Sequence, residues 1–154
     1  MIKRGKNKGN MTKEQLIKLL NQALELEHAA YIQYLSHAEL IDGLNGEPII
    51  ERIKEIAGDE QKHAEKFRTL IGDFLGGTPS MAIAPVKAAK NIKQILETNL
   101  KAEMDAIEIY KKIHASLKNE KLELADMFLE HEIRHVIMEE MEHVTELKLL
   151  LSMR

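Results

Sequence analysis

The sequence of 154 residues contains no cysteine, and this absence removes whole classes of site. Disulfide bonds, zinc ribbons, thiolate-ligated iron–sulfur clusters and thiol catalysis all need cysteine, so they are excluded. Proline and glycine are also scarce, with 3 and 8 residues respectively. Because these two residue types interrupt helices, their scarcity favours a helical chain.

Long apolar runs and a strong excess of one charge are missing as well. No run approaches the ~20 apolar residues that a membrane-spanning helix needs. The basic start of the chain has no apolar run behind it, as a secretory signal would. The net charge of −3 gives no reason to expect nucleic acid or a membrane surface as a partner. We therefore expect a soluble cytoplasmic protein.

The chain divides into a short tail and one domain. Residues 1–11 contain four lysine or arginine side chains, and we interpret them as a basic flexible tail, with a DNA-binding arm as the weaker alternative. Residues 12–152 are long enough for a single domain with a substantial core. Thr12 and Gln15 have the spacing of a capping box, which predicts that the first helix begins there.

Apolar residues spaced by three and four positions predict four long helices. They cover residues from about 12 to 41, 49 to 74, 91 to 117 and 121 to 151. The connection between the second and third helices has about 15 residues. An extended chain of that length spans ~50 Å, which exceeds the ~40 Å length of the helices. The expected fold is therefore an all-α four-helix bundle with a long crossover between helices two and three.

Two charged motifs interrupt the apolar stripes of the second and fourth helices. Each pairs a glutamate with a histidine three residues later, Glu60 with His63 and Glu132 with His135. At this spacing the two side chains lie on one face of a helix, one turn apart. A buried carboxylate is costly unless another group compensates its charge. The rest of the sequence must therefore supply groups that compensate the charge of Glu60 and Glu132.

The first and third helices each carry one glutamate at a stripe position, Glu27 and Glu103. Counting residues to and from the connecting turns places these two glutamates and both Glu-x-x-His motifs at about the same depth of an antiparallel bundle. Fifteen residues lead from Glu103 to Lys118, for example, and thirteen lead from Asn119 to Glu132. Four buried carboxylates are therefore expected at one level.

Four buried carboxylates need positive charge beside them. Two divalent cations balance the four negative charges, and two neutral imidazoles complete the ligands. Carboxylate with imidazole suits iron or manganese, and also zinc or cobalt. We therefore predict a dinuclear metal site formed by six residues: Glu27, Glu60, His63, Glu103, Glu132 and His135.

Other polar residues are assigned lesser roles. Tyr34, seven residues after Glu27, is a candidate for hydrogen bonding to a ligand or for redox chemistry. The later part of the fourth helix is interpreted as a solvated face, with an iron entry path or an accessory site as the alternative: Glu139, Glu142, His143 and Glu146. Four further histidines are interpreted as surface residues: His28, His37, His114 and His131.

Two segments resemble a known family. Residues 27–34 (EHAAYIQY) and 59–65 (DEQKHAE) are similar to the metal-ligand segments of ferritin-like di-iron carboxylate proteins, and most of all to those of bacterioferritin. The resemblance covers residues 12 to 150. It implies two iron ions, with manganese or zinc as alternatives. It further implies that Glu27 and Glu103 are terminal ligands, that Glu60 and Glu132 are bridges, and that each iron has one histidine.

The sequence also departs from related patterns. Gln61 stands where bacterioferritin has its haem-ligating methionine, so haem is not expected. The cysteine module of rubrerythrins is missing, and Ala106 stands where rubrerythrins have an extra glutamate. The last two differences mean that the full electron-transfer arrangement of rubrerythrins is not expected.

The resemblance and the site favour a ferroxidase, which oxidises Fe(II) with dioxygen or hydrogen peroxide in iron storage or detoxification. A rubrerythrin-like peroxide reductase, or a di-metal oxygenase acting on an unknown substrate, is the alternative use of the same site. A third hypothesis is a helical interaction module whose polar layer is merely structural. A homo-oligomer, at least a dimer, is expected, without membrane or nucleic acid.

Overall fold

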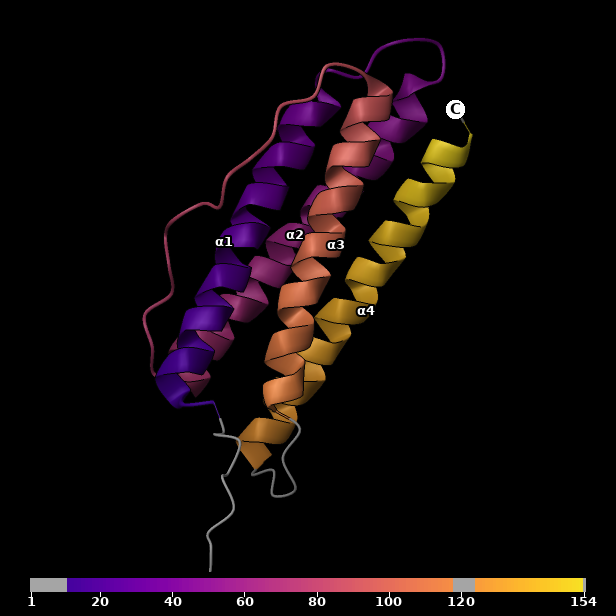
Figure 1. The fold of residues 1–154 in the computed structure, drawn as a ribbon. Coiled ribbons are helices and arrows are strands. Elements are labelled where there is room, and N and C mark those ends of the chain that lie inside the picture. The colour runs from indigo at the N-terminus through magenta and orange to yellow at the C-terminus, as the bar shows by residue number, and fades with distance from the viewer. Residues whose placement is uncertain (1–10, 118–123, 154) are drawn as a thin grey trace, which may run out of the picture.

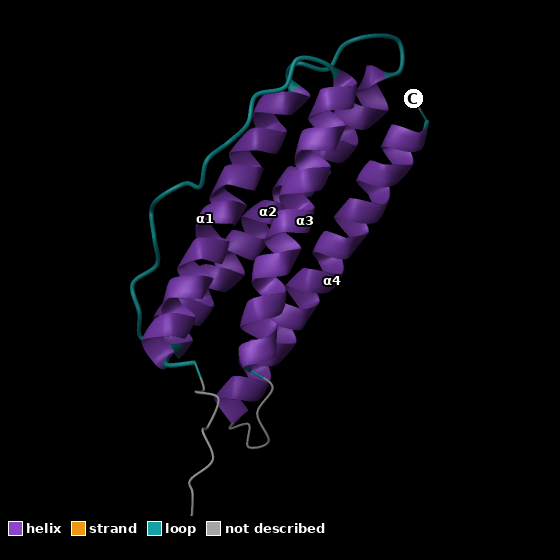
Figure 2. Ribbon diagram, in the orientation of Figure 1, coloured by secondary structure: helices purple, strands orange, loops and turns teal. Residues whose placement is uncertain are grey.

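A computed structural model describes residues 11–117 and 124–153. These residues form helices and no strand (Figure 2). The helices are α1 (Lys13–Ala38), α2 (Gly46–Thr69), a π-helical turn η1 (Leu70–Phe74), α3 (Ile92–Ser116) and α4 (Leu124–Ser152). The predicted four-helix bundle is confirmed. The flexible tail predicted at the start of the chain falls mainly on residues 1–10, which lie outside the described residues.

The crossover between α2 and α3 decides the direction of each helix. It runs along the length of α1 from one end of the bundle to the other (Figure 1). As a result, α3 starts at the end of the bundle where α1 finishes, and it runs parallel to α2. α1 packs mainly against α2, and α3 packs mainly against α4. The long crossover predicted from the sequence is therefore confirmed.

Side chains of α1 hold the first half of the crossover. The side-chain amide of Asn21 donates to the carbonyl of Thr78 (3.1 Å), and its Oδ1 accepts from the backbone N–H of Ser80 (2.7 Å). The hydroxyl of Ser80 donates to Glu25 Oε1 (2.6 Å). The two Asn21 bonds satisfy backbone groups that a bare loop would leave to water. They fix the crossover against the outer side of α1.

A buried polar network holds the second half. Gln33 Oε1 accepts from the backbone N–H of Lys87 (2.8 Å), and Gln33 Nε2 donates to Asn99 Oδ1 (2.9 Å). His37 lies between the carbonyl of Lys87 (2.9 Å) and the amide of Asn99 (2.9 Å). His37 is 3% exposed, so its interpretation as a surface residue was wrong. Burial lowers its pKa, which favours the neutral imidazole that this network needs.

The apolar core consists of two clusters at different heights. One is built around Leu20, Phe67 and Ile133, and the other around Ile53 and Leu96. The buried polar residues Glu27, Glu60, His63, Glu103, Glu140 and His143 lie between them in sequence on every helix. The bundle therefore has a polar layer across the middle of its core.

The helix ends follow the sequence. Thr12 and Gln15 form both hydrogen bonds of the predicted capping box. Gly76 ends the second helical segment with φ of +66°, which suits glycine because it has no Cβ. No helix within the described ranges is long and apolar enough to cross a membrane.

Candidate metal centre

Four glutamates, one from each helix, form the polar layer: Glu27, Glu60, Glu103 and Glu140. Each is exposed by 3% or less. The positions on α1, α2 and α3 are those predicted from the sequence. The position on α4 is not, because Glu140 takes the place predicted for Glu132.

Glu132 and His135 lie outside this layer. The side chain of His135 is 48% exposed and that of Glu132 is 19% exposed. Both contact Lys66 at the edge of α2, with Lys66 Nζ 3.5 Å from Glu132 Oε2 and 3.2 Å from His135 Nδ1. The predicted placement of these two residues in the buried site was therefore wrong.

The error lies in where α4 begins. Glu103 lies thirteen residues before the end of α3 at Ser116, whereas Glu132 lies only eight residues after the start of α4 at Leu124. At 1.5 Å per residue, these depths are ~20 Å and ~12 Å. Glu140 lies sixteen residues into α4, at a depth of ~24 Å. Figure 1 shows α4 beginning beyond the end of α3. About one additional helical turn of α4 therefore precedes the level of Glu103.

A signal in the sequence could have found the correct pair. The buried residues of α4 are spaced by fours and threes: Leu129, Ile133, Val136, Glu140, His143 and Leu147. Glu140 and His143 continue this stripe, whereas Glu132 and His135 each fall one position before a stripe residue. Glu140 and His143 have the same Glu-x-x-His spacing as Glu132 and His135. Only the helical period of the buried residues distinguishes the two motifs.

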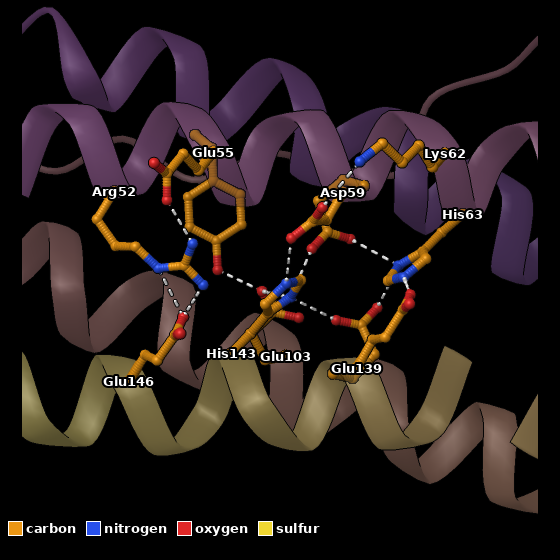
Figure 3. A network of polar contacts seen from close by, with 12 residues as sticks. Arg52, Glu55, Asp59, Lys62, His63, Glu103, Glu139, His143 and Glu146 are labelled. Carbon is orange, nitrogen blue, oxygen red and sulfur yellow. Dashed lines mark hydrogen bonds and ion pairs between the residues drawn. The ribbon is translucent and has the colours of Figure 1, made fainter. Parts of the chain in front are cut away.

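Both buried histidines point Nδ1 into the layer. His63 Nδ1 lies 3.3 Å from Glu140 Oε1 and 3.6 Å from both Glu27 Oε2 and Glu60 Oε2. His143 Nδ1 lies 2.9 Å from Glu60 Oε1 and 3.0 Å from Glu140 Oε2. The centroids of the two rings are 6.0 Å apart. Figure 3 shows His63 and His143 facing each other from α2 and α4.

The ligand atoms converge in two overlapping groups. One consists of Glu27, Glu60, His63 and Glu140, and the other of Glu60, Glu103, Glu140 and His143. Within each group, the ligand atoms lie within 4.8 Å of one another. Glu60 and Glu140 belong to both groups, whereas each group has its own terminal glutamate and its own histidine. This arrangement has the form of two metal positions with two shared carboxylates.

Several atoms of the layer lack hydrogen-bond partners among the described residues. They are Glu27 Oε2, both carboxylate oxygens of Glu60, His63 Nδ1 and Glu140 Oε1. His143 Nδ1 is close to Glu60 Oε1 but is not aligned for a hydrogen bond. Buried polar atoms are normally paired, so five orphans in one place need another partner. Carboxylate oxygens and an imidazole nitrogen are ligands for iron, manganese or zinc, and the residues present therefore fit a pair of such ions.

Two tyrosines support the terminal glutamates in a crossed pattern. The hydroxyl of Tyr34 on α1 donates to Glu103 on α3, and the hydroxyl of Tyr110 on α3 donates to Glu27 on α1. Burial and the nearby carboxylates raise the pKa of both hydroxyls well above the usual value, so both remain donors. Tyr34 thus has the hydrogen-bonding position that the sequence suggested.

Two outer carboxylates orient the histidines, again in a reciprocal pattern. His63 Nε2 lies 2.5 Å from Glu139, which precedes Glu140 on α4. His143 Nε2 lies 3.2 Å from Asp59, which precedes Glu60 on α2. A carboxylate on the outer ring nitrogen fixes the tautomer that leaves the inner nitrogen free to bind a metal. Figure 3 shows Asp59 and Glu139 beside their histidines.

The prediction of a solvated face on the later part of α4 is therefore only partly correct. Glu142 is exposed. His143 is buried in the layer, Glu139 contacts His63, and Glu146 accepts from Arg52 Nε on α2 (2.8 Å). The interpretation was wrong for His143 because the level of the site had been placed two turns too early on α4.

A cavity of about 120 Å³ leads to the layer between α1 and α3. At its outer end it is lined by exposed residues, Pro85 and Lys87 of the crossover and Lys101 of α3. At its inner end it reaches all four glutamates and both tyrosines: Glu27, Glu60, Glu103, Glu140, Tyr34 and Tyr110. Small side chains, including Ala30 and Ala102, form its walls. A small molecule can reach the layer by this route.

Sequence comparison agrees with the geometry. The Ferritin-like domain family model matches residues 17–153. The chain belongs to this ferritin-like family. The bacterioferritin of Brucella melitensis is 33% identical over 97 residues, which are 63% of this chain and 60% of the relative. The chain thus spans less than two-thirds of the length of that curated relative.

Two solved structures share the ferritin-like bundle. A ferritin-like diiron-carboxylate protein of Bacillus anthracis is 29% identical with a TM-score of 0.83, over 90% of this chain and 96% of that one. A dodecameric thioferritin of Bacteroides fragilis, described as bacterioferritin-related, is 26% identical with a TM-score of 0.80, over 94% of this chain and 88% of that one. The resemblance seen in the sequence is therefore confirmed for the family and the fold.

The pKa values of several groups in the buried layer are shifted by burial and by their neighbours. Burial lowers the pKa of His63 and His143, but the surrounding carboxylates outweigh it and raise the pKa of both. Burial and neighbouring negative charges raise the pKa of Glu60 and Glu140. For Glu27, burial raises the pKa, but interactions with Glu60 and His63 lower it more. These pKa shifts favour bound protons as the compensation for the carboxylate charge when no metal ion is bound.

The placement of Glu140 predicts different effects for two matched substitutions. Glu140→Gln removes a negative charge shared by both ligand groups, and we expect the affinity for Zn(II) to fall by roughly ten- to a hundred-fold. Glu132→Gln should leave two tightly bound ions per chain, because Glu132 lies outside the layer. Isothermal titration measures both, with circular dichroism as the check of folding. An equal loss of Zn(II) affinity in the two variants would contradict the assignment of Glu140, and not Glu132, as a ligand.

The bound protons predict the pH dependence of metal binding. Because the pKa of His63, His143, Glu60 and Glu140 is raised, cations must displace protons from these groups. Affinity for Zn(II) should therefore rise with pH from about pH 6.5, the usual pKa of histidine, upward, with proton release on binding. Titrations in two buffers of different ionisation enthalpy measure the released protons. An affinity independent of pH, with no proton release, would show that the layer is not protonated.

Proposed function

We propose that this chain binds two metal ions, with iron as the physiological metal, and oxidises Fe(II) with dioxygen or hydrogen peroxide. The ligands would be Glu27, Glu60, His63, Glu103, Glu140 and His143. One observation carries the proposal: the two ligand groups share Glu60 and Glu140 and contain buried polar atoms that have no other partner. A merely structural layer would be expected to satisfy those atoms within the protein.

The ligand residues would balance the charge of the substrate and its product. Four carboxylates offset the charge of two Fe(II) ions, and the same carboxylates favour the higher charge of Fe(III). A bound pair of Fe(II) ions would supply two electrons, one from each ion, to a single molecule of the oxidant. Tyr34 and Tyr110 donate to the terminal glutamates and so hold those carboxylates in position. Asp59 and Glu139 keep each imidazole turned toward the layer.

The size of the cavity favours a small oxidant over a large organic substrate. Its volume of about 120 Å³ is smaller than the ~150 Å³ of an engineered cavity that binds benzene. It is also well below the ~300–1,000 Å³ of sites for larger ligands. Dioxygen and hydrogen peroxide fit this space. The cavity therefore supports oxidant access in a ferroxidase or a peroxide reductase more than an oxygenase with a bulky substrate.

We also propose that the chain acts as a homo-oligomer, since storage of oxidised iron requires a shell. The Bacteroides fragilis relative, which covers most of this chain, is dodecameric. Haem is not included in the proposal, because Gln61 offers no thioether ligand.

Oxidation of added Fe(II) tests the proposal. We expect near-ultraviolet absorbance to rise after aerobic addition of two Fe(II) per chain, and Glu60→Ala should abolish the fast rise because it removes a shared ligand. Ala102→Leu fills the cavity wall, so it should slow oxidation by roughly ten-fold while two Fe(II) still bind under anaerobic conditions.

The matched control is Ala115→Leu, the same substitution at an exposed position of α3 that does not line the cavity. It should leave the rate of oxidation unchanged. The proposal fails if wild-type protein oxidises Fe(II) no faster than buffer, or if Glu60→Ala retains the wild-type rate.

A further inference from the structure

The crossover is held beside the cavity by three buried polar residues of α1 and α3. Gln33 Oε1 accepts from the backbone N–H of Lys87 (2.8 Å), and His37 Nε2 lies 2.9 Å from the carbonyl oxygen of the same residue. Asn99 contacts both Gln33 (2.9 Å) and His37 (2.9 Å). We propose that these three side chains form a proton-sensitive latch, and that protonation of His37 releases the crossover and widens the path of the oxidant. The effect on oxidation rests on the function proposed above.

The latch acts on the part of the crossover that lies at the mouth of the cavity. Pro85 and Lys87 line the outer end of the cavity, and Gln33 lines its wall. The N–H groups of Ala84 and Lys90 form hydrogen bonds of their own on either side, at 3.0 Å each. Between these two anchors, the described residues form no other hydrogen bond to the crossover backbone. Release of Lys87 therefore frees a short segment at the mouth, whereas the rest of the crossover stays along α1 (Figure 1).

The direction of each hydrogen bond in the latch is fixed by the backbone. Asn99 Nδ2 donates to the carbonyl of Ile95 (2.8 Å), which can only accept, and the same nitrogen faces His37 Nδ1. Nδ1 of His37 must therefore accept, so the ring proton lies on Nε2 and is donated to the carbonyl of Lys87. Gln33 donates to Asn99 Oδ1 and accepts from the Lys87 N–H. The closed latch thus requires a neutral imidazole.

A second proton on His37 has no acceptor in the latch. It would lie on Nδ1 and face the amide nitrogen of Asn99, which is also a donor. Rotation of the Asn99 amide would turn its oxygen toward the carbonyl of Ile95 and its nitrogen toward the donor of Gln33. The exposed fractions of Gln33, His37 and Asn99 are only 7%, 3% and 1%, so water does not replace the lost partners. Protonation is therefore incompatible with closure.

No neighbouring charge favours a protonated His37. Burial lowers its pKa, and the hydrogen bond to the carbonyl of Lys87 opposes this only in part. Among the described residues, the polar contacts of His37 are this carbonyl and the amide of Asn99. The charged side chains on the surrounding elements are exposed or bonded elsewhere: Glu39 and Lys54, which pair with each other, Lys87, Lys90, Glu97, and Glu103, which bonds to Tyr34.

The latch should therefore open on acidification. In the open form His37 has the usual histidine pKa of about 6.5, whereas in the closed form its pKa is lower. Closure is fully favourable above about pH 6.5 and is lost as the pH falls through the lower pKa of the closed form. The oxidant then meets a wider mouth.

Hydrogen exchange of the Lys87 N–H, measured by NMR spectroscopy on the full chain without metal ions, tests the latch. Its protection, relative to an unstructured chain at the same pH, should fall roughly ten-fold between about pH 7.5 and pH 5.5. The N–H of Ala84 is an internal control, because it donates to the backbone carbonyl of Glu25 in place of a latch residue. Its protection should stay constant.

Two substitutions separate the latch from other effects of acid. His37→Gln keeps a donor and an acceptor but binds no proton, so the protection of Lys87 should not depend on pH. Asn99→Asp places a carboxylate beside His37 and favours the imidazolium, so Lys87 should stay protected at low pH. The control His114→Gln changes a half-buried imidazole that bonds to Glu130, and it should behave as wild type.

The outcomes decide as follows for the latch. Protection of Lys87 that is equal at both pH values in wild type, or that falls as in wild type in either His37→Gln or Asn99→Asp, overturns it. Circular dichroism checks folding, and Asn99→Asp decides if His37→Gln does not fold.

The ratio of the Fe(II) oxidation rates of wild type and His37→Gln tests the effect on access. Both proteins have the same ligand residues, so protonation of the ligands cancels in the ratio. The rates should be equal at about pH 7.5, and wild type should be faster at pH 5.5 by up to roughly ten-fold. Equal rates at the lower pH overturn the effect on access. A wild-type chain that oxidises no Fe(II) at either pH overturns the proposed function and this effect with it, whereas hydrogen exchange still decides on the latch.

Discussion

The structure depends on one constraint: four carboxylates are buried at a single level of a helical core. Isolated charges in such a place are strongly unfavourable. Each of the four, Glu27, Glu60, Glu103 and Glu140, comes from a different helix, so every helix contributes to the same layer. The layer separates two apolar clusters, which supply the hydrophobic burial that stabilises the bundle. Those clusters stabilise the bundle, and the layer contributes the ligand atoms of the proposed metal centre.

The topology makes the layer nearly symmetric. Because the crossover sends α3 back in the direction of α2, each helix pair contributes one lone glutamate and one Glu-x-x-His motif. The same symmetry governs the supporting bonds, since each tyrosine holds the glutamate of the other pair. Each outer carboxylate likewise holds the histidine of the other motif. Removal of a supporting residue from one half is therefore expected to disturb a ligand in the other half.

Much of this could be predicted from the sequence, because it depends on local patterns. Helical periodicity, helix stop signals and the length of the crossover predicted the bundle, and a charged residue on an apolar stripe identified Glu27, Glu60, His63 and Glu103. The ligands on the fourth helix could not be identified by counting residues, since the count depends on the residue at which α4 begins, Leu124. Its own period of buried residues would have selected Glu140 and His143.

Other features depend on contacts between distant segments. His37 looked like a surface residue because its neighbours in sequence gave no sign that the crossover covers it at Lys87. The crossed bonds of Tyr34 and Tyr110 link residues 69 and 83 positions apart. No helical period shows which glutamate each tyrosine will reach. Such pairings follow from the packing of α1 against α3 and become visible only in three dimensions.

The central claim is that the buried layer holds two metal ions, and anomalous X-ray diffraction from crystals loaded with iron tests it most directly. Data collected at the iron absorption edge should show two peaks within the layer, one beside His63 Nδ1 and one beside His143 Nδ1, with Glu60 and Glu140 in contact with both. A layer without a peak, or with a single one, would contradict the account.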